Sequence, residues 1–196
     1  GMFQDCSSLT TVTIPNSETS IRQLAFDGCS SLTSITIPNS VISIGWNAFS
    51  GCRALTAITI PESVINVDGN AFADCSSLTS VDWNAINCGK LYNSHNRGYT
   101  YFEGDGFEFP DSTSYSYEEV GEFVKQFPWN EWDIINDSPF NGCDGIKSFS
   151  FGENVEFIPD GLCYGLDGIT SITIPESVSS IGERSFAECS SLDTIY

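Results

Sequence analysis

The chain has 196 residues, of which 40% are hydrophobic, enough for one elongated domain with a continuous core. Asp and Glu outnumber Lys and Arg by 26 to 7, so the formal net charge is -19. This charge repels phosphates and anionic headgroups, so we expect neither nucleic acid nor a bare membrane as a partner. No apolar run reaches the roughly 18 residues of a membrane span, so direct membrane insertion is not expected.

A phrase of 23 residues is repeated along the sequence. Cys6, Cys29, Cys52 and Cys75 follow one another at that interval, and each stands three residues after a Phe and three before a Leu. A unit this short cannot enclose a core alone, so each copy must bury its apolar residues against its neighbours. The repeat therefore predicts a solenoid.

Each copy contains one clear strand pattern. In residues 32–38, Ile35 and Ile37 alternate with polar residues, which is typical of a strand with one face turned inward. Pro38 ends the strand because proline has no amide hydrogen to donate to the next rung. The strands of successive copies should therefore stop at the same height.

The rest of the copy returns the chain to the next strand. Val41 and Ile44 predict a second inward-facing edge, and residues 47–52 are too few for a long helix. We expect one or two helical or 3-10 turns there, which bury Phe49. The predicted fold class is an α/β solenoid with short strands and short helical or 3-10 turns, interrupted by one inserted subdomain.

The cysteines are expected to be packed thiols. Six of them hold one repeat position, where Cys acts as a small apolar residue that faces the next coil. Because stacked coils lie about 4.8 Å apart, disulfides between neighbours stay a geometric alternative. No Cys-x-x-Cys or Cys/His cluster suggests a zinc site. The six are Cys6, Cys29, Cys52, Cys75, Cys143 and Cys189.

The phrases SLTSITIP at 31–38, SIG at 43–45 and AFSGC at 48–52 resemble the 23-residue leucine-rich repeats of the BspA-like family. The resemblance covers about residues 1–83 and 140–196. It implies a right-handed, curved superhelix with a strand ladder on its concave side. It also implies a bacterial protein that is secreted or attached to the cell surface and linked to adhesion and host-protein binding.

The repeat is interrupted once. Cys143 follows Cys75 by 68 residues, which is one repeat plus 45. We interpret this as one enlarged coil, although two degenerate copies would need only one residue more. The predicted organisation is leucine-rich repeats at 1–83, an aromatic and acidic insertion at 84–139, and leucine-rich repeats at 140–196.

The insertion is the first candidate binding region. Residues 82–139 hold 13 of the 25 aromatic residues and 11 of the 26 acids, whereas disordered segments are poor in aromatics, so we expect a small hairpin-and-helix subdomain. Most of its aromatics should form its own core, and an exposed minority could stack on sugars or anchor a protein. The candidates are Tyr92, Tyr99, Tyr101, Trp129 and Trp132.

The outward side chains of the strands, on the expected concave face, form the second candidate surface. Small hydroxyls dominate it, and it lacks the aromatic or Arg side chains that usually carry affinity. A tight site is therefore expected in the insertion or at its junction with this face. The candidates here are Ser34, Thr36, Thr59, Asp82, Ser148, Ser150 and Thr173.

Catalytic and metal-binding patterns are weak. Cys88 and the only histidine, His95, could be paired as nucleophile and base, but the residues around Cys88 match no nucleophile signature. Residues 103–108 offer oxygen ligands for calcium without the spacing of a dedicated loop. We therefore expect no catalytic site, no metal and no cofactor.

The sequence favours a noncatalytic recognition or adhesion protein, extracellular or on the cell surface, that binds protein or glycan partners such as host matrix or cell-surface molecules. One alternative is a structural spacer in a longer repeat array without its own ligand, and a remote one is an enzyme with its site in the insertion. Both ends of the chain fall inside copies, so a fragment or missing caps are expected. Open ends expose strand edges, which makes end-to-end self-association an additional expectation.

Overall fold

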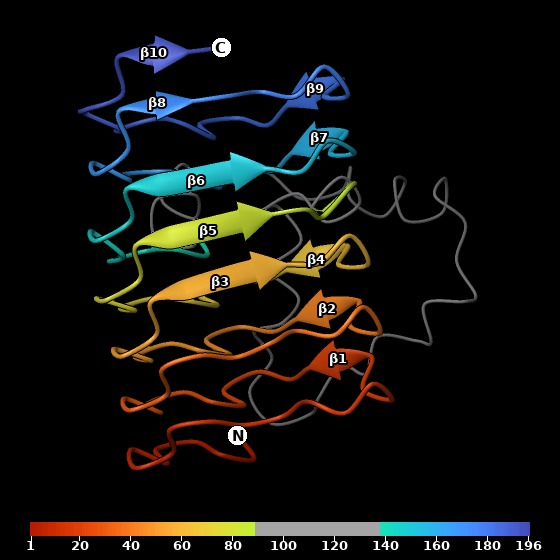
Figure 1. Cartoon of the computed structure of the whole chain (residues 1–196), viewed down its shortest axis with the longest axis vertical. Coiled ribbons are helices and arrows are strands. Elements are labelled where there is room, and N and C mark those ends of the chain that lie inside the picture. Colours follow the sequence, from red (N-terminus) through yellow and green to blue (C-terminus); the bar gives the residue numbers. More distant parts are fainter. Residues whose placement is uncertain (89–137) are drawn as a thin grey trace, which may run out of the picture.

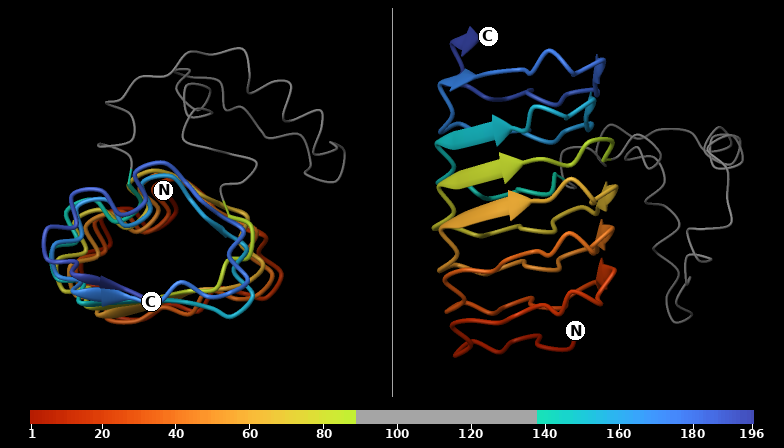
Figure 2. Two further views of the ribbon diagram at one scale, coloured as in Figure 1. Left: turned by 90° about the horizontal axis from the view of Figure 1, so that it is seen from above. Right: turned by 45° about the vertical axis from the view of Figure 1, so that its right-hand side comes forward.

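The computed structural model describes residues 1–88 and 138–196, which form one stack of coils (Figure 1). Short strands lie on two sides of the stack (Figure 2). In the described residues the strands are β1 (Ser20–Ile21), β2 (Ser43–Ile44), β3 (Ala57–Ile60), β4 (Asn66–Val67), β5 (Ser80–Trp83), β6 (Ser148–Phe151), β7 (Phe157–Ile158), β8 (Ser171–Ile172), β9 (Ser180–Ile181) and β10 (Thr194–Ile195).

The strands pair in parallel between coils. On one side β5 lies between β3 and β6, and β8 pairs with β10; on the other, β2 lies between β1 and β4, and β7 pairs with β9. Ala57 pairs with Ser80, and Ser80 pairs with Ser148, which stands 68 residues further along the chain. The parts before and after residues 89–137 therefore form one continuous solenoid, as the repeat predicted.

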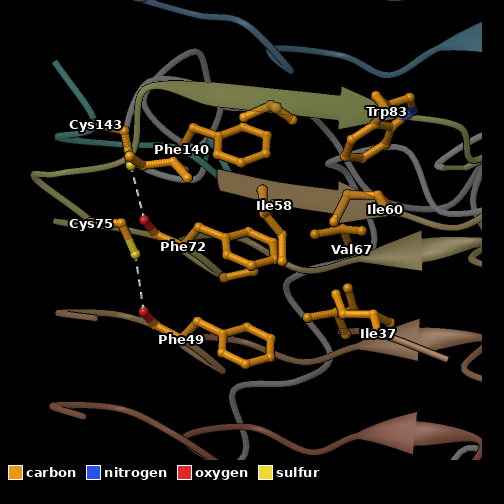
Figure 3. Close-up of a cluster of buried hydrophobic side chains, with 14 of the residues drawn as sticks. Ile37, Phe49, Ile58, Ile60, Val67, Phe72, Cys75, Trp83, Phe140 and Cys143 are labelled. Carbon is orange, nitrogen blue, oxygen red and sulfur yellow. Dashed lines mark hydrogen bonds between the residues drawn. The ribbon is translucent and has the colours of Figure 1, made fainter. Parts of the chain in front are cut away.

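Apolar side chains build columns inside this stack (Figure 3). The rings of Phe49 and Phe72 lie 5.1 Å apart between centroids and are tilted by only 6°. Phe140 continues the same column at 5.4 Å from Phe72. Trp83, in register with Ile60, is fully buried and packs edge-on against Phe140 at 6.5 Å. Alternating inward residues thus give one shared core across the coils.

The repeated cysteines form a second column beside the rings. The Sγ of Cys75 donates to the carbonyl oxygen of Phe49 at 3.2 Å, and the Sγ of Cys143 donates to that of Phe72 at 2.9 Å (Figure 3). These thiols form no disulfide with one another, and within the column only the one of Cys6 is exposed. The prediction of packed thiols is confirmed for the five buried or half-buried members, Cys29, Cys52, Cys75, Cys143 and Cys189, but not for Cys6.

The turns that bury the Phe rings differ from the expectation. The predicted helical or 3-10 turns at 47–52 are not confirmed, because no helix occurs in the described coils, and hence none that could cross a bilayer. The amides of Ala48 and Ser50 donate three residues back, but those of Phe49 and Gly51 donate to the next coil. Every second amide of this turn therefore donates to the next coil and not to a carbonyl within the turn, so no run of helical hydrogen bonds can form.

Residues with positive φ, in the left-handed region, make this alternation possible. They point every second amide N–H along the axis of the stack, toward the next coil. Each described coil has a residue with positive φ at one or both of two repeat positions. The first position is held by Leu24, Asn47, Asn70, Gly161 and Arg184, and the second by Asp5, Gly28, Gly51, Asp74, Gly142, Gly165 and Glu188.

The chain stays in the stack beyond β5. The carbonyl of Ile86 accepts hydrogen bonds from the amides of Glu156 and Phe157. The carbonyl of Ile42 accepts the same pair of bonds from the amides of Ile65 and Asn66 in the next coil. Cys88, two residues after Ile86, therefore takes the place of Ile44 in the core and is 2% exposed. The segment that leads from the strand to this position is two residues shorter than in the preceding coil.

The chain resumes the stack at Ser138. The amide of Asn141 donates to the carbonyl of Ser138, as the amide of Ala73 donates to that of Asn70. Ser138 thus takes the place of Asn70 and is buried. The described residues at both ends of the predicted insertion, 84–139, are hydrogen-bonded to the coils. The predicted hairpin-and-helix subdomain lies outside the described residues.

Candidate binding surface

The outward strand residues on the side of the stack that holds β3, β5, β6 and β8 form an exposed polar surface, which we name the hydroxyl face. Period-two alternation produces it, since the residues between them point into the core. All its members are exposed. They are Ser34, Thr36, Thr59, Asp82, Ser148, Ser150 and Thr173, the residues predicted for the concave strand face.

Asp82 is the charged centre of the hydroxyl face. The Oγ of Ser150 donates to its Oδ1 at 2.7 Å, and the Oγ1 of Thr59 approaches its Oδ2 at 3.5 Å. The neighbouring coils therefore hold the carboxylate from both sides. Because both hydroxyl hydrogens are directed to Asp82, their oxygens and the carboxylate are left to accept. This arrangement favours a partner rich in donors, such as an amine, a guanidinium or sugar hydroxyls.

A polar corner borders the hydroxyl face where the strands end. The Nδ2 of Asn154 donates to Oε1 of Glu62 at 3.0 Å, although a coil lies between them, because the turn after Trp83 is two residues shorter. Two shallow hollows lie at this corner. One is lined by Val12, Thr13, Ile14, Asn16, Thr36, Pro38, Asn39 and Ser40, and the other by Ile35, Thr36, Ile37, Asn39, Thr59, Pro61, Glu62 and Asn84.

This corner is not among the surfaces predicted from the sequence. A signal was present, because the residue after the strand-ending proline is an amide or an acid in each copy that keeps the proline: Asn16, Asn39, Glu62 and Glu176. The bond between coils two apart had no sequence signal, since it depends on the shortened turn.

The other candidate residues predicted from the sequence lie either outside the described residues or in the core. Tyr92, Tyr99, Tyr101, Trp129 and Trp132 lie outside the described residues, as do His95 and the acidic stretch 103–108. Cys88 is enclosed in the core and cannot meet a substrate at the surface. Within 1–88 and 138–196, no group of three or more His, Cys, Asp or Glu side chains is arranged to hold a metal ion.

The titratable groups are consistent with structural roles. Burial raises the pKa of the Cys52 thiol to about 12, and it also raises the pKa of the Cys163 thiol. Such thiols stay protonated and are poor nucleophiles. At the surface, the hydroxyl and the amide of Ser190 donate to Oδ1 of Asp167 at 2.6 and 2.9 Å, which lowers the pKa of this carboxyl.

Comparison with known protein families agrees with the repeat whose residues build the columns of the core. Six copies of the BspA type leucine-rich repeat region match residues 1–96 and 113–196. The chain belongs to the BspA-type leucine-rich repeat family. The resemblance inferred from the repeated phrase is confirmed. The comparison with curated proteins gave no match.

Three solved bacterial structures are similar to the chain. A leucine-rich repeat protein of Bacteroides ovatus is 24% identical over 98% of this chain and 50% of that one, with a TM-score of 0.44. A leucine-rich repeat protein of T. pallidum is 21% identical over 96% and 56%, with a TM-score of 0.47. A leucine rich cell surface protein of Faecalibacterium prausnitzii is 23% identical over 98% and 61%, with a TM-score of 0.37. The chain thus spans between 50% and 61% of these proteins.

Proposed function

We propose that this BspA-type chain is a noncatalytic recognition module of a secreted or surface-exposed protein, and that it binds a protein or glycan, including host matrix or cell-surface molecules. Its family membership and the F. prausnitzii cell surface protein support this location. The hydroxyl face is the binding surface in this proposal. The single observation that carries it is the oriented carboxylate of Asp82 between Thr59 and Ser150.

Charge and chemistry restrict the partner. With a net charge of -19 the chain disfavours sulfated or sialylated glycans and acidic proteins. A neutral glycan or a basic protein segment offers donors to Asp82 instead. A charge-assisted hydrogen bond contributes about 1.5–3 kcal/mol, so losing the carboxylate should weaken binding about tenfold or more.

The insertion is a second part of the proposed surface. Tyr92, Tyr99, Tyr101, Trp129 and Trp132 are its candidate anchors. Because Cys88 and Ser138 take the places of Val67 and Asn70, residues 89–137 can be replaced by Asp-Gly, the two residues found at positions 68 and 69. This short-link variant removes the insertion and keeps the coils.

The test is a binding screen of the chain against immobilised matrix proteins and neutral glycans, followed by titration of each hit. We expect Asp82→Ala to weaken saturable binding about tenfold, and Asp144→Ala, which removes an exposed acid outside the hydroxyl face, to leave it unchanged. Loss of binding only in the short-link variant would move the site to the insertion. No saturable binding at all would favour a structural spacer.

A further inference from the structure

Several departures from the repeat gather at one place, the polar corner where the chain leaves β3, β5 and β6 (Figure 1). Asn84 and Gly152 stand where the neighbouring copies have the strand-ending proline, and Asp82 stands where they have Thr or Ser. The shortened turn and the bond from Asn154 to Glu62 belong to the same corner. Because the other coils form without these changes, their clustering indicates a functional site.

The hollow lined by Glu62 and Asn84, which we name the corner hollow, has the layout of a small-ligand site. Its volume is about 400 Å³, within the range of roughly 300–1,000 Å³ that is usual for ligand pockets. Ile37 and Pro61, which are buried, and Ile35, which is half-buried, give it an apolar floor. The polar lining comes from three coils and consists of Thr36, Asn39, Thr59, Glu62 and Asn84.

The polar groups of the corner hollow include both acceptors and donors. Oε1 of Glu62 accepts the bond from Asn154 at 3.0 Å, which leaves the second carboxylate oxygen to accept from a ligand. The side-chain carbonyl of Asn84 lies against Gly152, where a Cβ would come within 2.5 Å of it. Within the two described ranges the side-chain amides of Asn39 and Asn84 donate to no protein group, so both are left to donate to a ligand.

We propose, on the basis of the recognition function proposed above, that the corner hollow binds one pyranose ring of a neutral glycan. A pyranose combines an apolar C–H face with hydroxyls that both donate and accept. The C–H face suits the floor of Ile and Pro side chains, and the hydroxyls suit the mixed polar lining. Thr59 lines the hollow and also approaches Asp82, so a glycan bound there continues onto the hydroxyl face.

Other classes of ligand match the corner hollow less well. A Lys or Arg side chain only donates, so it would pair with Glu62 and would leave the amides of Asn39 and Asn84 without an acceptor. An aliphatic side chain would cover the floor and leave the whole polar lining unpaired, which is unfavourable. A sulfate or carboxylate on a sugar would be repelled by Glu62 and by Asp82. The chemistry of the hollow therefore favours an uncharged sugar.

The neighbouring hollow extends the site along the stack. It shares Thr36 and Asn39 with the corner hollow and lies one coil away. Coils are about 4.8 Å apart, which is close to the length of one pyranose unit, so consecutive rings of a linear glycan can occupy the two hollows. An oligosaccharide should therefore bind about tenfold more tightly than its monosaccharide, because the second ring binds as part of the same molecule.

Isothermal titration calorimetry with four neutral sugars tests the site: cellotetraose, maltotetraose, mannotetraose and N-acetylated chitotetraose. We expect at least one of them to bind saturably, and Glu62→Gln to weaken this binding about tenfold, because Gln keeps the acceptor for Asn154 and loses the charge. Asn84→Ala, which removes a donor, should weaken it about fivefold. Glu176→Gln is the matched control, since Glu176 is exposed, holds the repeat position of Glu62 and lines neither hollow.

The outcomes separate the corner hollow from the proposed function. Binding of none of the four sugars, or equal affinity of Glu62→Gln, Glu176→Gln and the unmodified chain, would overturn the sugar site. A partner whose binding depends on Asp82 and not on Glu62 would also overturn it and would leave the hydroxyl face as the binding surface. The absence of any saturable partner, protein or glycan, would overturn the proposed function as well.

Discussion

Individual residues hold the coils together by repeating one contact along the stack, except in the coil where Leu166 stands at the cysteine position. The Sγ of Cys52 donates to the carbonyl of Phe26 at 3.3 Å, the bond that Cys75 makes to Phe49 one coil later. The thiol is small enough for the crowded interior, and it supplies a weak donor there. This explains why cysteine recurs in the repeat without forming disulfides in the column.

The buried thiols predict a loss of stability at alkaline pH. The pKa of Cys52 is about 12 in the folded chain against an ordinary value near 9.0, so its contribution is fully present below about pH 9 and is lost as the pH rises toward 12. Within this window the free energy of unfolding should fall by about 1.4 kcal/mol per pH unit for this thiol.

The measurement is denaturant unfolding between pH 8 and 11 under reducing conditions, for the chain and for Cys52→Ser. The serine hydroxyl does not titrate in this range, so the variant should have a shallower pH dependence. Equal slopes for both proteins would mean that the Cys52 thiol is not protected in the fold. Measuring the difference between the two cancels the titration of the other groups.

Among the elements, the strands were predictable and the turns were not. Alternation at Ile58 and Ile60 specifies an inward face wherever the strand is placed, and the proline after it specifies the end. The turn around Phe49 depends on amides that donate to the next coil, a partner that local sequence does not reveal. The expectation of helical turns used only local length and burial.

The left-handed positions predict which glycines matter. Gly142 and Gly165 have φ of 70° and 71°, but a Cβ on Gly142 would lie 2.6 Å from Oδ1 of Asp74, whereas one on Gly165 would meet nothing within 4 Å. Gly165→Ala should cost only the backbone strain, about 1–2 kcal/mol. Gly142→Ala should cost more, because Asp74 must also move.

Thermal or denaturant unfolding of the two alanine variants checks this difference. The pair is matched, since both replace glycine at the same repeat position with the same residue. A Gly165→Ala cost equal to or larger than that of Gly142→Ala would show that the contact with Asp74 has no influence.

In the whole molecule, continuity of the stack decides whether the hydroxyl face exists. Aligning the copies already placed Asp82 and Ser150 at one position, so this part of the candidate surface could be predicted. The core position of Cys88 could not, because the turn before it is shortened by two residues and the repeat phrase no longer applies. The structure of residues 89–137 and the role of their aromatics stay predictions.

Unfolding of the short-link variant, with 89–137 replaced by Asp-Gly, tests most directly whether the coils on both sides form one solenoid. One stack predicts a single cooperative transition by circular dichroism, with a free energy of unfolding no lower than that of the full chain, since the closed loop is shorter. Two separate transitions, or an unfolded variant, would contradict the continuous stack and the hydroxyl face built on it.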